Sequence, residues 1–258
     1  MALAALIAGG FWYYWSGLQR EAAELPLVVE EREVPDELPR IGPLHPIAES
    51  EFAVEGEDQA ELVELPPLGE SDAYLKLELA ELFGDSIANL IAESRVIERV
   101  VASVDNLPRT HVAERMRPLT PLAGAFEVYE EGISQYAISQ DTYERFDPLV
   151  AIVTSVDTAD LLGLYRRYYS MFQTAYVDLG YPDGYFNDRL VETIDDMLAT
   201  PEVADPIMLV RPHVLYEFAD PDLEARSAGQ KLMLRMGSEN AAQIKSKLRE
   251  LREAITAS

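Results

Sequence analysis

The sequence predicts a mostly α-helical domain of about seven helices with one small β-hairpin, preceded by a transmembrane anchor and a disordered acidic linker. Apolar residues recur at spacings of three and four through most of residues 71–258, the period of a helix with one buried face. One short segment, residues 125–139, alternates instead, as a half-buried strand does. The 258 residues are 48% hydrophobic and contain no cysteine, so a single sizeable core must hold the fold without disulfides.

Residues 1–18, MALAALIAGGFWYYWSGL, carry no charged side chain and predict the membrane anchor. As a helix they reach roughly 27 Å, close to the thickness of a bilayer's hydrocarbon core. The aromatic run from Phe11 to Trp15 suits the membrane interface, and its bulk argues against a signal-peptide cleavage site. A buried soluble helix is the other alternative. Because no basic residue precedes the apolar run, we expect the natural chain to begin upstream of Met1.

Residues 19–70 predict a disordered linker. The stretch 21–70 holds 15 acidic residues, two arginines and seven prolines, for a net charge of −13. It buries too little apolar surface to offset the entropy lost on ordering, and its prolines forbid long helices. An acidic bait for a basic partner is the alternative to a solvated spacer. The whole chain has a net charge of −25, so we expect no nucleic-acid partner.

Residues 71–258 begin with two predicted helices and the hairpin. Ser71 and Asp72 are typical caps for a helix that continues through Leu82 and stops at Gly84. A second helix is expected over residues 87–104. After a proline-rich loop, apolar residues alternate on both sides of Glu130-Glu131-Gly132, which predicts a hairpin with its turn at these residues.

Four further helices are expected between the hairpin and Gly237. They cover residues 141–156, 158–179, 185–198 and 220–237, and Asp141 and Asp157 are the predicted N-caps of the first two. Residues 207–218 alternate and therefore predict extended structure. Pro212 lies among them and argues against a central strand, because proline cannot donate to the ladder.

A last helix begins at Ser238, the predicted cap. Its apolar residues follow a strict helical spacing at Ala241, Ile244, Leu248, Leu251 and Ile255. Its other faces carry Lys245, Lys247, Arg249 and Arg252. Two heptads are short for a coiled coil, so we expect this helix to pack within its own domain rather than on a partner helix.

The sequence contains no motif that identifies an enzyme. The absence of cysteine excludes a thiol nucleophile, and neither a phosphate-binding glycine loop nor a serine-hydrolase elbow is present. The three histidines are His45, His111 and His213; His111 and Glu114 form H-x-x-E, which lacks the paired histidines of a zinc protease helix. We therefore expect no cofactor and no metal.

Two groups of carboxylates remain. Asp183, Asn187, Asp188 and Glu192 place oxygen atoms around one turn, but without the alternation of a calcium loop, and helix capping is the simpler explanation. Asp195 and Asp196 are adjacent, so on a helix they point about 100° apart and cannot flank one bond.

The most informative side chains are aromatic and basic. Six of the 13 tyrosines lie in residues 165–185, with arginines interleaved, and this combination is typical of recognition surfaces. Tyr165, Tyr168 and Tyr176 share the apolar helix face and are predicted core residues. Tyr169, Tyr181 and Tyr185 lie off that face.

A second basic run contains Arg95, Arg99, Arg109, Arg115 and Arg117. It is either a site for an anionic partner or a set of internal ion pairs. The candidate binding residues are Arg109, Arg115, Arg117, Arg166, Arg167, Tyr169, Tyr181, Asp183, Tyr185, Asn187, Arg189 and His213. We predict no catalytic residue.

Three segments carry a resemblance to a known family. VDNLPR (104–109), LGYPDGYFNDRL (179–190) and YEFADPDLEARSAGQKLMLRMG (216–237) resemble the signature segments of domain-of-unknown-function family 3014. The resemblance covers residues 71–253. It implies a single-pass envelope protein of Gram-negative bacteria with an inner-membrane anchor and a periplasmic domain, and it implies no activity, cofactor or catalytic residue. Arg20, Arg32 and Arg40 after the anchor favour the opposite orientation by the positive-inside rule.

Together these observations predict a membrane-tethered periplasmic interaction or scaffold module of the cell envelope, whose partner is an envelope protein or a cell-wall component. The alternative is a carboxylate-dependent cell-wall hydrolase or peptidoglycan-binding domain. Such a hydrolase would use Asp183, Asp188 or Glu192, with His213 as the acid or base. It requires these four side chains to converge in one concave pocket.

Overall fold

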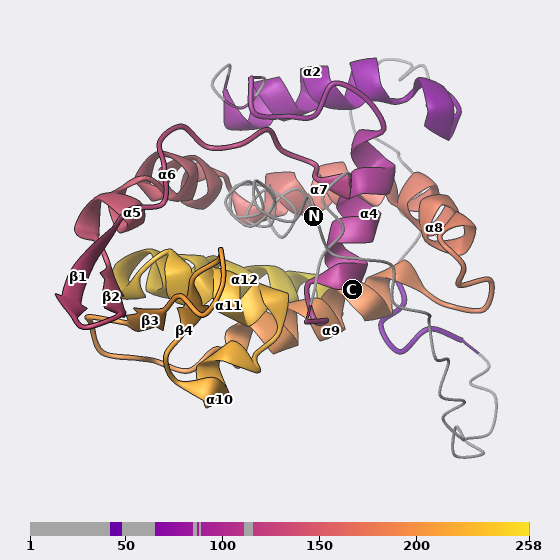
Figure 1. The fold of residues 1–258 in the computed structure, drawn as a ribbon. Helices are drawn as coiled ribbons and strands as arrows, with labels where there is room; N and C mark the ends of the chain where they lie inside the picture. The colour runs from indigo at the N-terminus through magenta and orange to yellow at the C-terminus, as the bar shows by residue number, and fades with distance from the viewer. Residues whose placement is uncertain (1–41, 48–64, 85–86, 88, 111–115, 258) are drawn as a thin grey trace, which may run out of the picture.

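The structure is a computed structural model and describes residues 42–47, 65–84, 87, 89–110 and 116–257. In this part of the chain the fold is mostly helical, with a small antiparallel sheet at one side (Figure 1). The predicted fold class is confirmed at this level. The predicted anchor and most of the predicted linker lie outside the described residues.

Among the described residues, no single helix is both long enough and apolar enough to cross a membrane. The stretches Gln140–Ser155 and Thr158–Arg167 have the necessary length and composition only when taken together, and they meet at a bend of 80°.

Several helices are shorter than the sequence predicts. After a single 3₁₀ turn, η1 (Leu68–Glu70), the helices are α2 (Asp72–Phe83), α4 (Val96–Asn106), α5 (Gln140–Glu144), α6 (Asp147–Ser155), α7 (Thr158–Arg167), α8 (Tyr169–Asp178), α9 (Phe186–Leu198), α10 (Pro221–Glu224), α11 (Ala228–Arg235) and α12 (Ser238–Thr256). Of these, α2, α9 and α12 have close to the expected bounds.

Four of the predicted helices are interrupted or shortened for local reasons. The helix expected from residue 87 begins only at Val96, because Ile91 pairs with Leu119 in a β-bridge and Arg95 has a left-handed backbone with φ 58°. The helix expected over 158–179 breaks at Tyr168, whose backbone is not helical. Those over 141–156 and 220–237 also each form two helices.

Caps account for several of these boundaries. The Asp157 side chain accepts a hydrogen bond from Ala159 N–H, as predicted, and Ser227 caps α11 through Gln230 N–H. Asp141, in contrast, lies inside α5 and caps nothing. Gly237, with φ 86°, takes the N-cap position of α12 that was predicted for Ser238.

The predicted hairpin is part of a four-stranded sheet. The strands β1 (Val128–Gly132), β2 (Gln135–Ile138), β3 (Met208–Val210) and β4 (Glu217–Phe218) pair antiparallel in the order β1-β2-β3-β4. The turn lies at Ile133 and Ser134 rather than at Glu130-Glu131-Gly132, and Ser134 adopts φ 59° there. The prediction that 207–218 holds no central strand is wrong, because Pro212 falls in the loop after β3, which is an inner strand.

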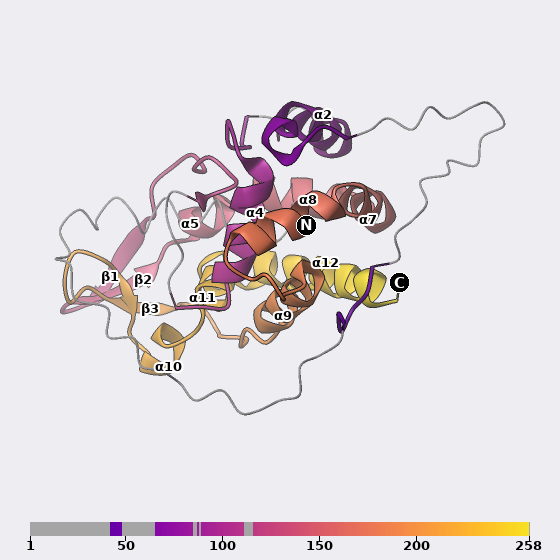
Figure 2. The ribbon, with the colours of Figure 1, turned by 90° about the vertical axis from the view of Figure 1, so that its right-hand side faces the viewer.

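Helix α12 organises the main core. It packs against α6, α7, α9 and α11, and Figure 2 shows it between α9 and α7, with α2 at the top of the molecule. Its predicted apolar stripe is buried, apart from the half-buried Ala241. The expectation that this helix packs within its own domain is therefore confirmed.

Two lysines of α12 are buried, contrary to their predicted place on its outer faces. Lys245 is 7% exposed and donates to the Thr200 carbonyl at 2.6 Å, and Lys247 is 6% exposed and donates to the Val156 carbonyl at the same distance. Each carbonyl lies at the C-terminal end of a neighbouring helix, where cations are favoured. The two ammonium groups therefore cap α9 and α6.

Candidate functional site

The centre of the candidate site is Asp105, a buried carboxylate near the end of α4 that is only 4% exposed. Its Oδ2 accepts a hydrogen bond from Arg109 Nη2 at 2.7 Å, and its Oδ1 lies 3.2 Å from Arg189 Nε. The Arg189 side chain is also largely buried, whereas half of the Arg109 side chain is exposed. A buried carboxylate thus holds two arginines, of which one faces solvent.

Tyr181 completes this cluster from the loop between α8 and α9. Its hydroxyl accepts from Arg109 Nη2 at 2.6 Å and donates to Asp105 Oδ2 at 3.2 Å. Its ring stacks on Tyr176 with centroids 4.6 Å apart. Burial, with the Asp105 charge, raises the pKa of Tyr176 to about 12. The Asp105 carboxylate therefore fixes the Arg109 side chain, and stacking on Tyr176 fixes the Tyr181 ring.

Arg189 links the two helices behind this surface. Its Nη2 donates to the Asp105 carbonyl at 2.5 Å, and its Nη1 donates to Glu192 Oε2 at 2.7 Å. Burial acts to lower the pKa of Arg189, but Glu192 and Asp105 outweigh it and the pKa is raised. Arg189 therefore stays charged and holds α4 against α9.

A second set of contacts lies at the first turn of α9. Asn187 is fully buried; its Oδ1 accepts from the Tyr165 hydroxyl at 2.9 Å, and its Nδ2 donates to the His45 carbonyl at 2.7 Å. Both oxygens of Asp188 accept backbone N–H groups, from Leu44 at 2.9 Å and from His45 at 2.8 Å. A segment inside the predicted linker is thus seated on α9.

Of the other predicted candidates, Tyr169 packs its ring edge-on against Tyr165 of the second cluster, with centroids 5.7 Å apart, and the rest join neither cluster. Arg167 forms an ion pair with Glu78 at 2.9 Å, and Arg117 accepts through its carbonyl from Arg99. Tyr169 is half-buried and packs against the core rather than lying exposed, and Arg166 is half-buried on α7. Tyr185 is 37% exposed, and Asp183 is exposed. Arg115 lies outside the described residues.

The four side chains that a hydrolase would need are not gathered. His213 is exposed in the loop between β3 and β4, at the opposite side of the molecule from the α8–α9 loop that carries Asp183 (Figure 1). Asp188 and Glu192 are engaged by backbone N–H groups and by Arg189. Asp195 pairs with Arg252, and Asp196 accepts from Ser227 and Gln230.

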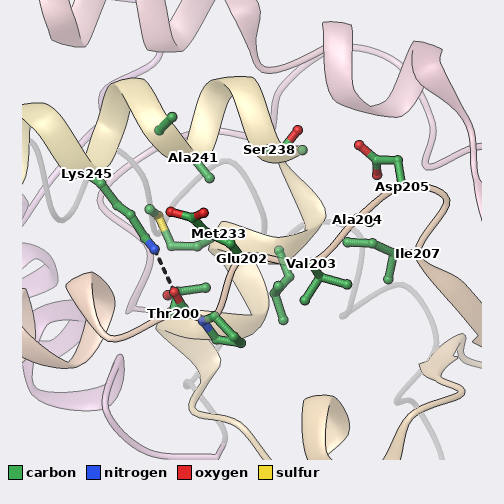
Figure 3. A pocket seen from close by; sticks show the side chains of 14 residues that line it. Thr200, Glu202, Val203, Ala204, Asp205, Ile207, Met233, Ser238, Ala241 and Lys245 are labelled. Atoms are coloured by element: carbon green, nitrogen blue, oxygen red, sulfur yellow. Dashed lines mark hydrogen bonds between the residues drawn. The ribbon is translucent and has the colours of Figure 1, made fainter.

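A cavity of about 430 Å³ lies between the segment after α9 and the junction of α11 and α12 (Figure 3). Val203, Ile207 and Met233 supply apolar wall, and the Lys245 ammonium donates to the Thr200 carbonyl at its edge. Sequence patterns gave no signal for this cavity, because a loop and two helix ends form it. Elsewhere too, within the described residues, no group of three or more His, Asp or Glu side chains is arranged to hold a metal ion.

Neither the role of Asp105 nor the contact of residues 44–45 with α9 is predicted by the sequence patterns. Asp105 sits among buried apolar residues of α4, and a lone acid on such a face was the available signal. Taken together, the fold and the site define a mostly helical domain with a fixed arginine and tyrosine surface. Residues 96–252 match the family DUF3014, described as a protein of unknown function, and the chain belongs to this family. No curated protein and no solved structure matches the chain.

Proposed function

We propose that this protein is a non-catalytic interaction or scaffold module of the bacterial cell envelope, tethered to the inner membrane through residues 1–18, with its domain in the periplasm. The apolar, aromatic-ended N-terminus and the resemblance described above support the tether and the orientation. The partner is an envelope protein or a cell-wall component that presents an acidic group to the exposed half of Arg109.

The observation that carries this proposal is the arrangement of Arg109 and Tyr181 on buried Asp105. Arginine and tyrosine are enriched where proteins bind proteins, and they contribute most when their rotamers are fixed beforehand. Because Asp105 and the Tyr176 ring fix both side chains in the free protein, little side-chain entropy is lost when a partner binds.

The hydrolase alternative gains no support from the geometry. Glycosidic hydrolysis uses two carboxyl groups that flank one bond, about 5 to 9.5 Å apart. The oxygens of Asp188 accept two backbone N–H groups, Glu192 pairs with Arg189, and His213 lies at the far side of the domain.

The test is site-specific photocrosslinking of the full-length protein in intact cells. A photoreactive residue at position 185 lies in the same loop as Tyr181, and one at Leu77, which is 67% exposed on α2, is the matched control. We expect discrete products from position 185 only, reduced at least fivefold by Arg109→Ala with Tyr181→Phe. Equal products from both positions, or no effect of the double variant, contradict the proposal. Altered muropeptides after incubation of wall sacculi with the protein would favour the hydrolase.

A further inference from the structure

The segment Gly42–Ile47 lies on the first turn of α9 and is held mainly through its backbone. The N–H groups of Leu44 and His45 both donate to the carboxylate of Asp188, and the His45 carbonyl accepts from Asn187. Ile47 packs against the main core, whereas the Leu44 side chain is 58% exposed. The chain bends at Leu44 and His45, so that both N–H groups face the one carboxylate, and the contacts involve this bent backbone and one apolar side chain.

Asn187, one of the two residues that hold this segment, is itself held by a contact in which the segment takes no part. Asn187 is fully buried, and the Tyr165 hydroxyl donates to its Oδ1, which directs the Nδ2 group toward the His45 carbonyl. Burial raises the pKa of Tyr165 well above its ordinary value, so that the hydroxyl remains a donor. An amide with a fixed orientation and a carboxylate with two acceptor oxygens match the N–H and the carbonyl of one residue and the N–H of the residue before it.

The sequence contains a second copy of the same pattern. LHPIAES at residues 44–50 and LPPLGES at residues 65–71 share leucine, proline, glutamate and serine at matching positions, with an aliphatic residue at the fourth. In the second copy, Leu65 and Leu68 pack against the main core. Pro66 stands where the first copy has His45, and proline has no N–H to donate. The second copy therefore cannot make both contacts to Asp188.

We infer that the first turn of α9 is a binding site for bent peptide segments that present two consecutive backbone N–H groups and an aliphatic residue two positions later, as Leu-His-Pro-Ile does, and that Gly42–Ile47 is its built-in occupant. A partner protein that presents such a segment competes with residues 42–47 for Asn187 and Asp188. Peptide binding at the first turn of α9 does not depend on the cellular compartment in which the domain lies.

The attached segment Gly42–Ile47 determines the affinity that a competing peptide needs in order to displace it. A tethered segment acts at an effective concentration of about millimolar, so a free hexapeptide of equal intrinsic affinity displaces it only near that concentration. Weakening the attached segment should therefore expose the site to a peptide supplied in solution. The substitution His45→Pro does this with the residue that the second copy already carries, and Leu44→Pro removes the other N–H.

The experiment is an NMR titration of the ¹⁵N-labelled full chain with the capped peptide GPLHPI. The signals followed are the Asn187 side-chain amide and the Asp188 backbone amide. We expect the His45→Pro protein to bind the peptide with an apparent Kd at least tenfold lower than the wild type shows. The peptide GPLPPI should not bind either protein. Leu44→Pro serves as the second background if His45→Pro shows a lowered melting temperature.

Two further variants separate recognition from general charge effects. In the His45→Pro background, Asp188→Asn replaces one acceptor oxygen with a donor and should weaken binding of GPLHPI at least tenfold. Asp183→Asn removes the same charge from the exposed loop before α9 and should leave the Kd unchanged. Equal binding of GPLHPI and GPLPPI, equal affinity in the Asp188→Asn and Asp183→Asn proteins, or no shift in either opened background would overturn the inference.

Discussion

The carboxylate of Asp105 lies 3.2 Å from the Nε atom of Arg189, and this ion pair joins the end of α4 to the start of α9. Both partners are largely shielded from water, with side chains 6% and 15% exposed. The same carboxylate supports the exposed Arg109, so one buried charge has both a structural and a surface role.

The contacts of Asp105 with Arg189 and with Arg109 should differ in their contribution to the free energy of unfolding. Asp105→Asn leaves the buried Arg189 guanidinium without the Asp105 carboxylate as a charged partner. We expect this variant to lower the free energy of unfolding by about 3 kcal/mol. Arg109→Ala removes a half-exposed ion pair and should cost less than about 1 kcal/mol. Denaturant unfolding measures both values. Equal losses for the two variants would contradict the assignment of Arg189 as the structural partner.

Gly237 should not tolerate a side chain. Its φ of 86° is unfavourable for other residues, and a Cβ atom at this position would lie 2.8 Å from Cγ of the Tyr143 ring. We expect Gly237→Ala to destabilise the protein by about 2 kcal/mol, through strain and overlap together. Gly163→Ala, in α7 with nothing within 4 Å of the added Cβ, is the control and should stabilise by about 0.5 to 1 kcal/mol. Thermal unfolding of both variants tests the pair, and a neutral Gly237→Ala would show that the turn before α12 differs from the one described.

Alkaline pH should weaken the fold through Tyr176. Its pKa is about 12 in the folded chain, because of burial and the Asp105 charge, against 10.0 for the ordinary phenol. The folded state therefore holds this proton more tightly, so the stabilisation is fully present below pH 10 and is lost as pH rises through 12. We expect the unfolding free energy to fall over this window, and Tyr176→Phe to remove part of that slope while leaving the values between pH 7 and pH 9 parallel to the wild type. An unchanged slope in Tyr176→Phe would mean that this phenol titrates normally.

The local features of the fold are well predicted from the sequence. The start and end of α9, the cap at Asp157, the stop at Gly84 and the existence of the hairpin all follow from short-range chemistry, namely turn residues, capping side chains and apolar spacing. These signals need only a few neighbouring residues, and they hold because the tertiary structure agrees with them.

The helix breaks and the buried charges follow from contacts between distant residues instead. Ile91 leaves the predicted helix because Leu119 pairs with it, and Lys245 is buried because the end of α9 needs a donor. Helical spacing places Lys245 outside the apolar stripe but cannot show that a helix end lies beside it. Asp105 is hidden for the same reason, since its two arginines come from different parts of the chain.

The candidate site was predicted in part. Arg109, Tyr181 and Arg189 were named from composition and do meet, although 72 residues separate the first two. Asn187 and Asp188 were interpreted as helix caps. Their contact with residues 44–45 was not foreseen, because an acidic, proline-containing stretch gives no pattern of burial. The repeated LxP pattern was the usable signal, and it lies in the composition-biased region itself.

The most direct test of the peptide site at the first turn of α9 is amide hydrogen exchange of the full-length protein, measured at Leu44 and His45. The structure predicts slowed exchange at both amides in the wild type and in Asp183→Asn, because each N–H donates to Asp188. Asp188→Asn keeps one acceptor oxygen and replaces the other with a donor, so at least one of the two amides should return to the exchange rate of an unstructured peptide while protection in α12 stays unchanged. Fast exchange at Leu44 and His45 in the wild type, or protection of both amides that survives Asp188→Asn, would contradict a peptide site at the first turn of α9.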